Sequence, residues 1–366
     1  METTDRSTTA ATADIKDIET RISDTDRRIA ELFEERMHAV RDEELYRSAH
    51  GLPASDPARD ADMLEKLSAL ISDDSLRAYY INFMRGMLGI SDRYRHRLAK
   101  GMRIAYSGVE GAYANIAARK IFPDGKAIGF PGFGAAYDAV TSGECDCAVL
   151  PIENSYAGDV GQVIDLMYTG SLHVSGMYTL RVSHSLLCVP GATADDIRKV
   201  VSHPQALMQS SDFLNQHDWQ QLSMENNAVA AQKVRDEKDP SQAAVAGEVA
   251  GEIYGLKKLA GPINNCPDNT TRFLILAKDR VYQAGAEKIS LCFELPHRSG
   301  TLYSMLGNFI FNDVNMRMIE SRPIPEESWQ YRFFVDIEGN LEDAGVQNAL
   351  YGIMREAKNV KILGNY

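Results

Sequence analysis

The chain has 366 residues, which is enough for two or three domains that each bury a core of their own. Its 39 lysine and arginine residues face 51 acidic residues, so the net charge is −12, and no long basic block interrupts the sequence. This balance argues against binding of nucleic acid or of an anionic membrane through a general positive field. An anionic ligand would therefore need a local cationic pocket.

The five cysteines are scattered and odd in number, which is typical of reduced thiols rather than of a disulfide framework. Cys145 and Cys147 have no second pair of cysteine or histidine ligands nearby, so a metal site is not indicated. Residues 1–14 are polar, and no apolar run reaches a membrane-spanning length. We expect a cytoplasmic protein with a disordered leader.

Residues 14–98 have the apolar spacing of helices. The pattern predicts a long first helix that ends near Gly51, a second helix over 58–71, and a third over 76–98 that Asp73 can cap. The apolar stripe of the first helix consists of Ile15, Ile18, Ile22, Ile29, Leu32 and Val40. Three such helices form too thin a bundle to bury themselves well, so we expect them to dimerise.

Arg36 occupies a position on that stripe where an apolar residue is expected. A guanidinium there needs a partner, which is either a buried carboxylate or an anionic ligand. Arg47 and Arg59 add positive charge to the same bundle, and Asp56 and Asp60 are placed to orient them.

From residue 102 onward the pattern alternates between strands and helices. Strands are predicted over 102–106, 147–150, 180–189, 199–201 and 243–246. Polar or glycine residues follow three of these strands: Ser107 and Gly111, then Glu153, Asn154 and Ser155, then Ser202, His203 and Gln205. Ligands bind beyond the carboxyl ends of strands in open α/β sheets, so we infer one α/β ligand-binding unit over 102–278 with two lobes around a cleft.

The segment 268–273 has the sequence DNTTRF and leads into the apolar strand 274–277. Two hydroxyls and a guanidinium at the mouth of a buried strand can be held rigidly toward an anionic ligand. Asn-Thr-Thr before a strand is also ordinary turn chemistry, so both interpretations stand on these residues alone.

After a polar linker over 279–287, the pattern predicts a smaller module. Strands are expected over 288–294, 315–321, 329–338 and 360–362, with helices over 300–311 and 344–357. This βαββαβ order is the ferredoxin-like arrangement.

Three motifs carry a resemblance to a known family. The segments PIENS (151–155), SHPQA (202–206) and NTTRF (269–273) occur in the order seen in prephenate dehydratase, and GTLY (300–303) with ESRP (320–323) resembles the phenylalanine-sensing ACT domain. The helical region resembles the all-helical chorismate mutase. The chain is thus similar to the bifunctional enzymes, which implies a mutase bundle over 14–98, a two-lobed, periplasmic-binding-protein-like dehydratase domain over 102–278, and an ACT domain over 288–366.

For the dehydratase, the resemblance implies that Thr271 donates a hydrogen bond to the leaving hydroxyl of prephenate, with Glu153 behind it. Arg272, Asn154 and Ser155 would hold the substrate or shape the cleft. Further substrate-binding residues implied by the motifs are Ser107, Gly111, Ser202, His203, Gln205 and Phe273. Aromatisation drives the reaction, so no metal or organic cofactor is expected.

For the mutase, the rearrangement of chorismate needs cations that hold a dianion in its compact conformer. The positions that match the mutase pattern are Arg36, Arg47, Asp56, Arg59, Asp60, Ser91 and Arg95. Arg47 replaces the family's lysine, Glu19 stands where the family has an arginine, and Arg95 where it has a glutamine. An active mutase and a degenerate bundle kept for dimerisation both remain open.

The C-terminal resemblance implies a phenylalanine site between subunits of a homodimer or homotetramer. Its residues would be Gly300, Thr301, Leu302, Glu320, Ser321 and Arg322. The alternative is that Glu320 and Arg322 form only a surface ion pair. A non-catalytic amino-acid sensor is the rival function for the whole chain, because a cleft with such a module could also signal through its oligomeric state.

Overall fold

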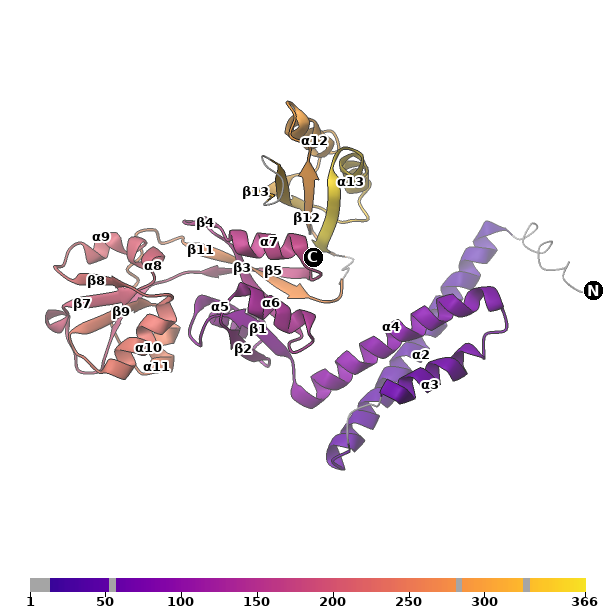
Figure 1. Ribbon diagram of the computed structural model, residues 1–366, viewed down its shortest axis with the longest axis horizontal. Coiled ribbons are helices and arrows are strands. Elements are labelled where there is room, and N and C mark those ends of the chain that lie inside the picture. Colours follow the sequence, from indigo (N-terminus) through magenta and orange to yellow (C-terminus); the bar gives the residue numbers. More distant parts are fainter. Residues whose placement is uncertain (1–13, 53–56, 281–284, 325–329) are drawn as a thin grey trace, which may run out of the picture. The chain divides into compact units, whose positions relative to one another are not determined.

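The computed structural model describes residues 14–52, 57–280, 285–324 and 330–366, and over 57–62 it describes the backbone alone. The predicted leader, Asp56 and Trp329 lie outside these residues. The chain divides into two compact units, which meet at the 101–102 peptide bond (Figure 1). All five cysteines lie in the second unit as free thiols. Within the described chain, we find no helix with the length and hydropathy needed to cross a membrane.

The described part of the first unit is helical, as predicted. Its helices are α2 (Ile15–Ala49), α3 (Pro57–Ser68) and α4 (Asp74–Lys100). Asp73 caps α4, because its carboxylate accepts the backbone N–H of Ser75 at 3.0 Å. Both α2 and α3 pack against α4. The buried apolar residues among those described are few: Val40, Met84, Met87 and Leu88.

The predicted apolar stripe of α2 is largely exposed within this unit. Ile15 keeps 63% of its surface accessible and Leu32 keeps 61%, whereas Val40 is buried. The reason is length, since α2 has 35 residues while α3 has 12 and α4 has 27. The stripe therefore does not form an internal core, and its apolar surface faces outward.

The first lobe of the second unit is built on a sheet in the order β2-β1-β3-β11-β5. Its strands are β1 (Arg103–Ser107), β2 (Lys126–Phe130), β3 (Cys147–Asn154), β5 (His173–Arg181) and β11 (Thr270–Ala277), with the short β4 (Gly158–Asp159) beside β3. Helix α5 (Tyr113–Ile121) packs on one face, and α6 (Phe133–Thr141) and α7 (Gly161–Thr169) pack on the other.

The second lobe has a sheet in the order β10-β6-β9-β7-β8. Its strands are β6 (Ser185–Cys188), β7 (Lys199–Ser202), β8 (Gln220–Ser223), β9 (Gln242–Ala246) and β10 (Lys257–Ala260). Its helices are α8 (Pro204–Met208), α9 (Ser211–Leu214), α10 (Asn227–Glu237) and α11 (Glu248–Tyr254), and a 3₁₀ turn η1 covers Ala194–Asp196. The predicted two-lobed α/β arrangement is confirmed.

The single strand predicted over 180–189 is wrong. Strand β5 ends at Arg181 in the first lobe and β6 begins at Ser185 in the second, so the predicted strand is divided between two sheets. Residues 182–184 form one crossing, and residues 261–269 form the return crossing to β11.

The C-terminal module contains β12 (Lys288–Leu295), α12 (Thr301–Ile310), β13 (Met316–Pro323), β14 (Tyr331–Glu338), α13 (Ala344–Glu356) and β15 (Lys358–Asn365). Its strands are antiparallel in the order β13-β14-β12-β15, and both helices pack on one face of this sheet. The opposite face packs on the first lobe, where Phe334 and Leu363 join the hydrophobic cluster that contains Ile152 and Val163. This shared core fixes the module against α7 and the sheet of the first lobe.

Candidate functional site

A cavity of about 1030 Å³ lies between the two lobes of the second unit. Residues at the ends of β1, β3 and β11 form one wall, and residues of α8 and the start of α10 form the other. Such a volume suits a small organic ligand. The predicted residues at its wall are Ser107, Asn154, His203, Gln205, Thr271 and Phe273.

Asn154 and Thr271 lie opposite each other on the neighbouring strands β3 and β11. The Asn154 Oδ1 atom accepts hydrogen bonds from the backbone N–H groups of Tyr156 (3.1 Å) and Ala157 (3.0 Å). Since these donors are backbone groups, they fix the orientation of the carboxamide. Its Nδ2 atom then donates to Thr271 Oγ1 at 2.9 Å and to Asn269 Oδ1 at 2.8 Å.

The Thr271 hydroxyl lies at the cavity wall, and 9% of the residue is exposed. Because its oxygen accepts a hydrogen bond from Asn154, its own hydrogen must point elsewhere. No acceptor for that hydrogen is found among the side chains and backbone groups that the structure describes. The site therefore offers one hydroxyl hydrogen to a ligand in the cavity.

Three further polar residues beside this pair were not predicted, and two of them, Gln209 and His184, also line the cavity. Gln209 Nε2 donates to Asn154 Oδ1 at 3.3 Å, while Gln209 Oε1 accepts from Asn269 Nδ2 at 3.0 Å. His184 Nε2 lies 3.0 Å from the same Gln209 oxygen. Asn269 and Gln209 lie within or beside the motifs noted in the sequence. His184 lies in none of them, and the only local signal is that Ser183 and Ser185 flank it within the strand predicted over 180–189.

The cavity wall contains the N-termini of α5 and α7, and no side chain caps either helix. Helix N-termini present unpaired N–H groups and a partial positive charge, so they attract anions. Among the described lining residues there is no lysine or arginine, whereas Asp159 and Glu225 are present. The local cationic pocket expected from composition is therefore not found in this cavity, and neutral donors take its place.

Arg272 and Glu153 were expected in the cleft, and this expectation is corrected. They are register partners on β11 and β3, and Arg272 Nη1 donates to Glu153 Oε2 at 2.9 Å on the face away from the cavity. Neighbouring residues of a strand point to opposite faces, so Asn154 rather than Glu153 stands behind Thr271. On that face of the sheet, burial raises the pKa of Asp336 in β14 to about 6, although the nearby guanidinium of Arg272 lowers it.

The remaining predicted cleft residues have structural contacts. Ser202 is fully buried and donates to the carbonyl oxygen of Val245 at 2.5 Å, and Ser155 Oγ accepts the backbone N–H of Thr270 at 3.0 Å. Gly111 has φ +83°, and a Cβ there would lie 3.2 Å from the backbone of Ala250 in the other lobe. Gly111 thus permits a close approach of the two lobes.

Side chains of the C-terminal module contact both ends of α7. Arg322 Nη2 donates to Asp165 Oδ2 at 2.9 Å, and its guanidinium lies so close to Gly161 that a Cβ there would overlap it. At the other end of the helix, Lys361 Nζ donates to the carbonyl oxygen of Met167 at 3.0 Å, and the Arg332 guanidinium lies 3.9 Å from the ring centroid of Tyr168. Helix α7, whose N-terminus lies at the cavity wall, is therefore held in place by contacts with the module.

The other residues predicted for phenylalanine lie on the same module. Gly300 is the N-cap of α12 with φ +85°, Thr301 Oγ1 donates to the carbonyl oxygen of Pro296, and Leu302 is 39% exposed. Glu320 and Ser321 lie on β13 beside Arg322. Burial, and then the charges of Asp159 and Glu153, raise the pKa of Glu320 above its ordinary value.

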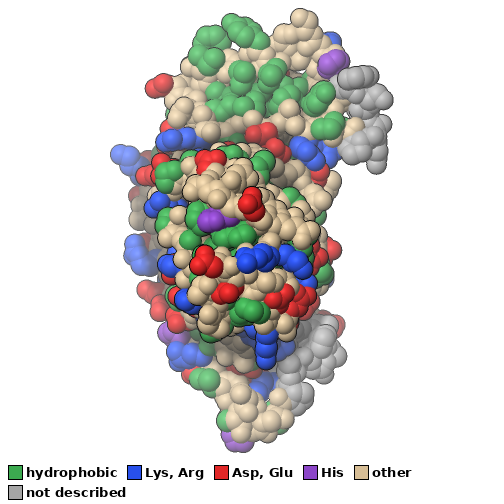
Figure 2. Space-filling view, turned by 90° about the vertical axis from the view of Figure 1, so that its left-hand side faces the viewer, with side chains coloured by type: hydrophobic (Ala, Val, Ile, Leu, Met, Phe, Trp, Pro, Cys, Tyr) green, Lys and Arg blue, Asp and Glu red, His purple; other side chains and the backbone are tan. Residues whose placement is uncertain are grey.

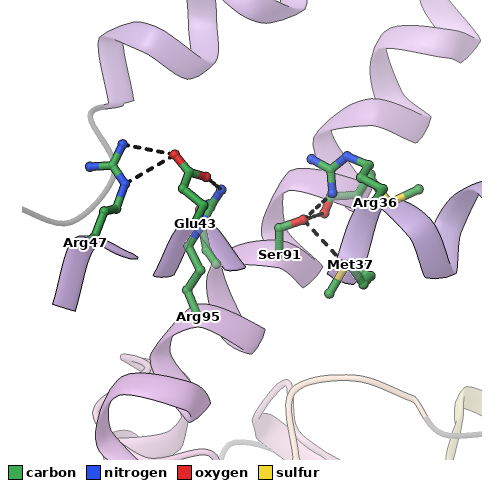
Figure 3. A network of polar contacts seen from close by, with 8 residues as sticks. Arg36, Met37, Glu43, Arg47, Ser91 and Arg95 are labelled. Atoms are coloured by element: carbon green, nitrogen blue, oxygen red, sulfur yellow. Dashed lines mark hydrogen bonds and ion pairs between the residues drawn. The ribbon is translucent and has the colours of Figure 1, made fainter. Parts of the chain in front are cut away.

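The first unit contains a second polar site, formed by side chains of α2 and α4 (Figure 3). Arg36 Nη1 donates to Ser91 Oγ at 2.5 Å, and Ser91 is completely buried. Ser91 Oγ in turn donates to the carbonyl oxygen of Met87 at 2.8 Å. The predicted residues Arg36 and Ser91 are thus brought together across the helix interface.

Glu43, which was not predicted, joins two of the predicted arginines (Figure 3). Its Oε1 atom accepts from Arg47 Nη2 at 3.0 Å, and its Oε2 atom accepts from Arg95 Nη2 at 3.0 Å. Arg95 also pairs with Asp92 at 2.8 Å. Burial raises the pKa of Glu43, but the hydrogen bonds from Arg47 and Arg95 outweigh burial and hold that pKa below its ordinary value. The i,i+4 spacing of Glu43 and Arg47 is the signal in the sequence that could have identified it.

Three predicted mutase residues cannot be placed. Asp56 lies outside the described residues, and the side chains of Arg59 and Asp60 lie outside them as well. Glu19 is exposed on the first turns of α2. Over the described ranges, no group of three or more histidine, cysteine, aspartate or glutamate side chains is arranged to hold a metal ion.

Comparison with known proteins places both units. The family model for prephenate dehydratase matches residues 104–281, and that for chorismate mutase type II matches residues 18–95. The bifunctional chorismate mutase/prephenate dehydratase of Neisseria gonorrhoeae is 33% identical over 85% of each chain. That of Stutzerimonas stutzeri is 30% identical over 96% of this chain and 97% of its own. Arogenate dehydratase/prephenate dehydratase 2 of Arabidopsis thaliana is 37% identical over 72% of each chain.

Two solved structures are similar to most of this chain. The prephenate dehydratase of Arthrobacter aurescens in complex with L-Phe is 27% identical, with a TM-score of 0.68 over 72% of this chain and 89% of its own. A chain described as GqqA, a novel type of quorum quenching acylases, is 30% identical, with a TM-score of 0.67 over 72% of this chain and 96% of its own. From its two matched units and its coverage by bifunctional relatives, the chain belongs to the family of bifunctional chorismate mutase/prephenate dehydratases.

Proposed function

We propose that the cleft of the second unit converts prephenate to phenylpyruvate, carbon dioxide and water, with Thr271 as the donor to the leaving hydroxyl. The observation that carries this proposal is the free hydroxyl hydrogen of Thr271 at the cavity wall, held by Asn154. Ser107 and Phe273 would contact the substrate from the same wall and His203 and Gln205 from the opposite wall. Gly111, Ser202 and Ser155 would shape the cleft through their structural contacts.

The chemistry requires such a donor. The electron pair of the bond to the ring carboxylate becomes a ring π bond as carbon dioxide departs, and the opposite C–O bond breaks to release the hydroxyl, which takes up a proton to form water. A threonine hydroxyl is a weak acid, so Thr271 would stabilise the charge that develops on the leaving oxygen. The hydrogen bond from Asn154 polarises the hydroxyl and strengthens it as a donor. The N-termini of α5 and α7 would hold the carboxylates.

Arogenate is a second candidate substrate for the same cleft. It carries an ammonium group where prephenate carries a keto oxygen, and a relative in Arabidopsis thaliana is named for both substrates. The observation that favours it is the pair Asp159 and Glu225 in a described lining without lysine or arginine. Asp159 also interacts with Arg322, which leaves Glu225 as the better partner for an ammonium group.

For the first unit, we infer that it rearranges chorismate to prephenate, and that Arg36, Arg47 and Arg95 bind the dianion, with Ser91 orienting Arg36. Asp56, Arg59 and Asp60 would complete the pocket. Glu43 offsets part of the positive charge of this cluster and fixes the two guanidinium groups beside it. The acidic Glu19 is then compatible with an active mutase, because Arg95 supplies a cation held in position by Glu43 and Asp92.

For the C-terminal module, we propose a ferredoxin-like ACT domain that binds phenylalanine through Gly300, Thr301 and Leu302 and through Glu320, Ser321 and Arg322. Its strand order and the phenylalanine in a solved prephenate dehydratase support this assignment. A ligand that moves Arg322 would act on Asp165 and Gly161 of α7, and so on the cavity wall. Binding at one site would thereby change the free energy of binding at the other.

We also propose a cytoplasmic homodimer or homotetramer. The exposed stripe of α2 needs an apolar partner, and hydrophobic side chains gather over the C-terminal module at the top of Figure 2. The large exposed apolar residues of that module are Leu302, Tyr303, Ile310, Phe311, Ile319, Tyr351 and Met354. A pure amino-acid sensor is disfavoured, since it has no use for a hydroxyl donor poised in the cleft.

Thr271→Ala is expected to lower dehydratase kcat by about 100-fold, because one donor to the developing oxyanion is lost. Thr271→Ser should keep most of the turnover, and Thr270→Ala on the same strand is the matched control. Turnover is followed as phenylpyruvate formation, with thermal unfolding as the check on folding. A Thr271→Ala protein with wild-type turnover would remove this residue from the mechanism.

The variant Glu225→Gln tests whether the cleft recognises arogenate by its ammonium group. If arogenate binds through its ammonium group, this variant should lower kcat/KM for arogenate by about 10-fold, the typical loss of one charge-assisted hydrogen bond. The value for prephenate should stay the same or rise, because a negative charge has been removed near an anion. Equal effects on both substrates would show that Glu225 does not recognise the ammonium group.

Arg36→Ala should lower chorismate consumption by about 10- to 100-fold through loss of a charged hydrogen bond to the dianion. Dehydratase turnover on added prephenate should not change, because Arg36 belongs to the other compact unit. Arg27→Ala, an exposed arginine of the same helix, is the control. Unchanged mutase activity in Arg36→Ala would locate the mutase pocket elsewhere.

Asp165→Asn tests the contact between the module and α7. The phenylalanine response of the dehydratase should shrink, while its basal turnover stays within about threefold, since Asp165 is a partly exposed residue outside the cavity wall. Arg317→Gln removes another ion pair of strand β13 and serves as the control. A full response with unchanged phenylalanine affinity, measured by calorimetry, would contradict the proposed route.

A further inference from the structure

We infer that His184 is a positioning residue of the dehydratase site, which holds Thr271 in its donor geometry through Gln209 and Asn154. The inference rests on the proposed dehydratase function. It assigns a role to a residue that no motif of the sequence contains and that the reaction chemistry does not itself require.

His184 lies where the chain crosses between the two lobes, and 1% of it is exposed. Its backbone N–H donates to Asn264 Oδ1 at 2.6 Å, and its carbonyl oxygen accepts the N–H of Ile263 at 2.9 Å. Asn264 and Ile263 belong to the return crossing, so His184 joins both connections of the lobes. A side chain anchored there is fixed relative to either half of the cleft.

The direction of each hydrogen bond follows from the backbone anchors on Asn154. Since Asn154 Oδ1 accepts from two backbone N–H groups, Gln209 must approach that oxygen with its Nε2 donor, at 3.3 Å. The Gln209 oxygen then faces Asn269 and His184. His184 can satisfy this oxygen only with a hydrogen on Nε2, which fixes the imidazole tautomer.

The other ring nitrogen faces helix α5. His184 Nδ1 lies 2.9 Å from the hydroxyl of Tyr113, the first residue of that helix, and this hydroxyl also lies 2.8 Å from the carbonyl oxygen of Ser183. Burial lowers the pKa of His184, against a smaller effect of the Gln209 hydrogen bond, so the ring is neutral. A neutral ring with its hydrogen on Nε2 donates to Gln209, and its Nδ1 can accept the single hydrogen of the Tyr113 hydroxyl when that hydrogen turns from the Ser183 carbonyl oxygen.

Loss of the Nε2 hydrogen would leave Asn269 as the remaining donor to the Gln209 oxygen, so the Gln209 amide would be held less tightly. The backbone N–H groups of Tyr156 and Ala157 would still set which end of the Asn154 carboxamide faces Thr271, but the weaker contact from Gln209 would let the carboxamide, and with it the Thr271 hydroxyl, shift from the donor position. Misplacement of a reacting group by about 1 Å can cost about 100-fold in rate. The penalty should fall on kcat, because the Tyr113 hydroxyl at the start of α5 keeps the carbonyl oxygen of Ser183 as its partner and the N-terminus of α7 is not touched.

The experiment compares His184→Leu, His184→Gln and His184→Asn in the full-length protein. Gln places an amide N–H near the position of Nε2 and preserves the bond to Gln209, whereas Leu and Asn do not. We expect His184→Leu and His184→Asn to lower dehydratase kcat by about 10- to 100-fold with KM within about threefold, and His184→Gln to recover most of the loss. His217→Leu, an exposed histidine of the same lobe, is the control.

The rescue by Gln separates positioning from mere stability. A purely structural role would lower the melting temperature of all three variants without a split between kcat and KM, and that result would overturn the inference. So would wild-type turnover in His184→Leu, or a Gln variant as slow as the Asn variant. Should His184→Leu fail to fold, the Asn and Gln pair decides alone. Wild-type protein that does not consume prephenate would overturn the proposed function instead.

Discussion

Two backbone N–H groups, those of Tyr156 and Ala157, fix the carboxamide of Asn154, and the polarity of the whole cleft follows from that contact. Side-chain amides can often turn over without cost, but an amide oxygen held by the main chain cannot. The Asn154 nitrogen must therefore face Thr271, and the Thr271 hydrogen must face the cavity. The donor that we propose for the leaving hydroxyl is thus directed by the backbone turn at 156–157.

The two units present different groups to an anion, and on the proposed assignments this difference suits their reactions. In the first unit, guanidinium groups from α2 and α4 gather around Glu43 and Ser91, and a rearrangement that needs only a fixed conformer is served by strong point charges. The described wall of the cleft presents neutral donors and helix N-termini. Arg272 and Arg322 lie in ion pairs outside that wall. Neutral donors bind a departing carboxylate less tightly than a guanidinium would, which favours release of carbon dioxide.

Much of the architecture can be predicted from the sequence, because the helical and strand periods are strong and the polar residues follow strand ends. The position of Asp73 as a cap, the strands around 149 and 275, and the element order of the C-terminal module are of this kind. The face of the sheet to which a side chain points is harder to predict from the sequence. Arg272 and Glu153 were expected in the cleft because the motifs contain them next to Thr271 and Asn154, but consecutive residues of a strand point to opposite faces.

The remaining omissions come from contacts between distant segments. The segment 180–189 was predicted as one strand, although the polar residues 183–185 within it coincide with the change of sheet. His184 and Gln209 meet only because two crossings and a helix of the second lobe converge. Likewise, Glu43 accepts a hydrogen bond from Arg95, which is 52 residues away along the chain. Tertiary pairs of this kind leave no periodic signal.

The hydrophobic cluster shared by the C-terminal module and the first lobe bears on how regulation can evolve. Phe334 and Leu363 of the module cover the layer that contains Ile152 and Val163. A chain truncated before β12 would expose that layer, at a cost of roughly 25 cal/mol for each Å² of apolar surface. On the proposed regulatory role of the module, feedback-insensitive variants should therefore arise by substitution within it, because its deletion would expose apolar surface of the first lobe and promote aggregation.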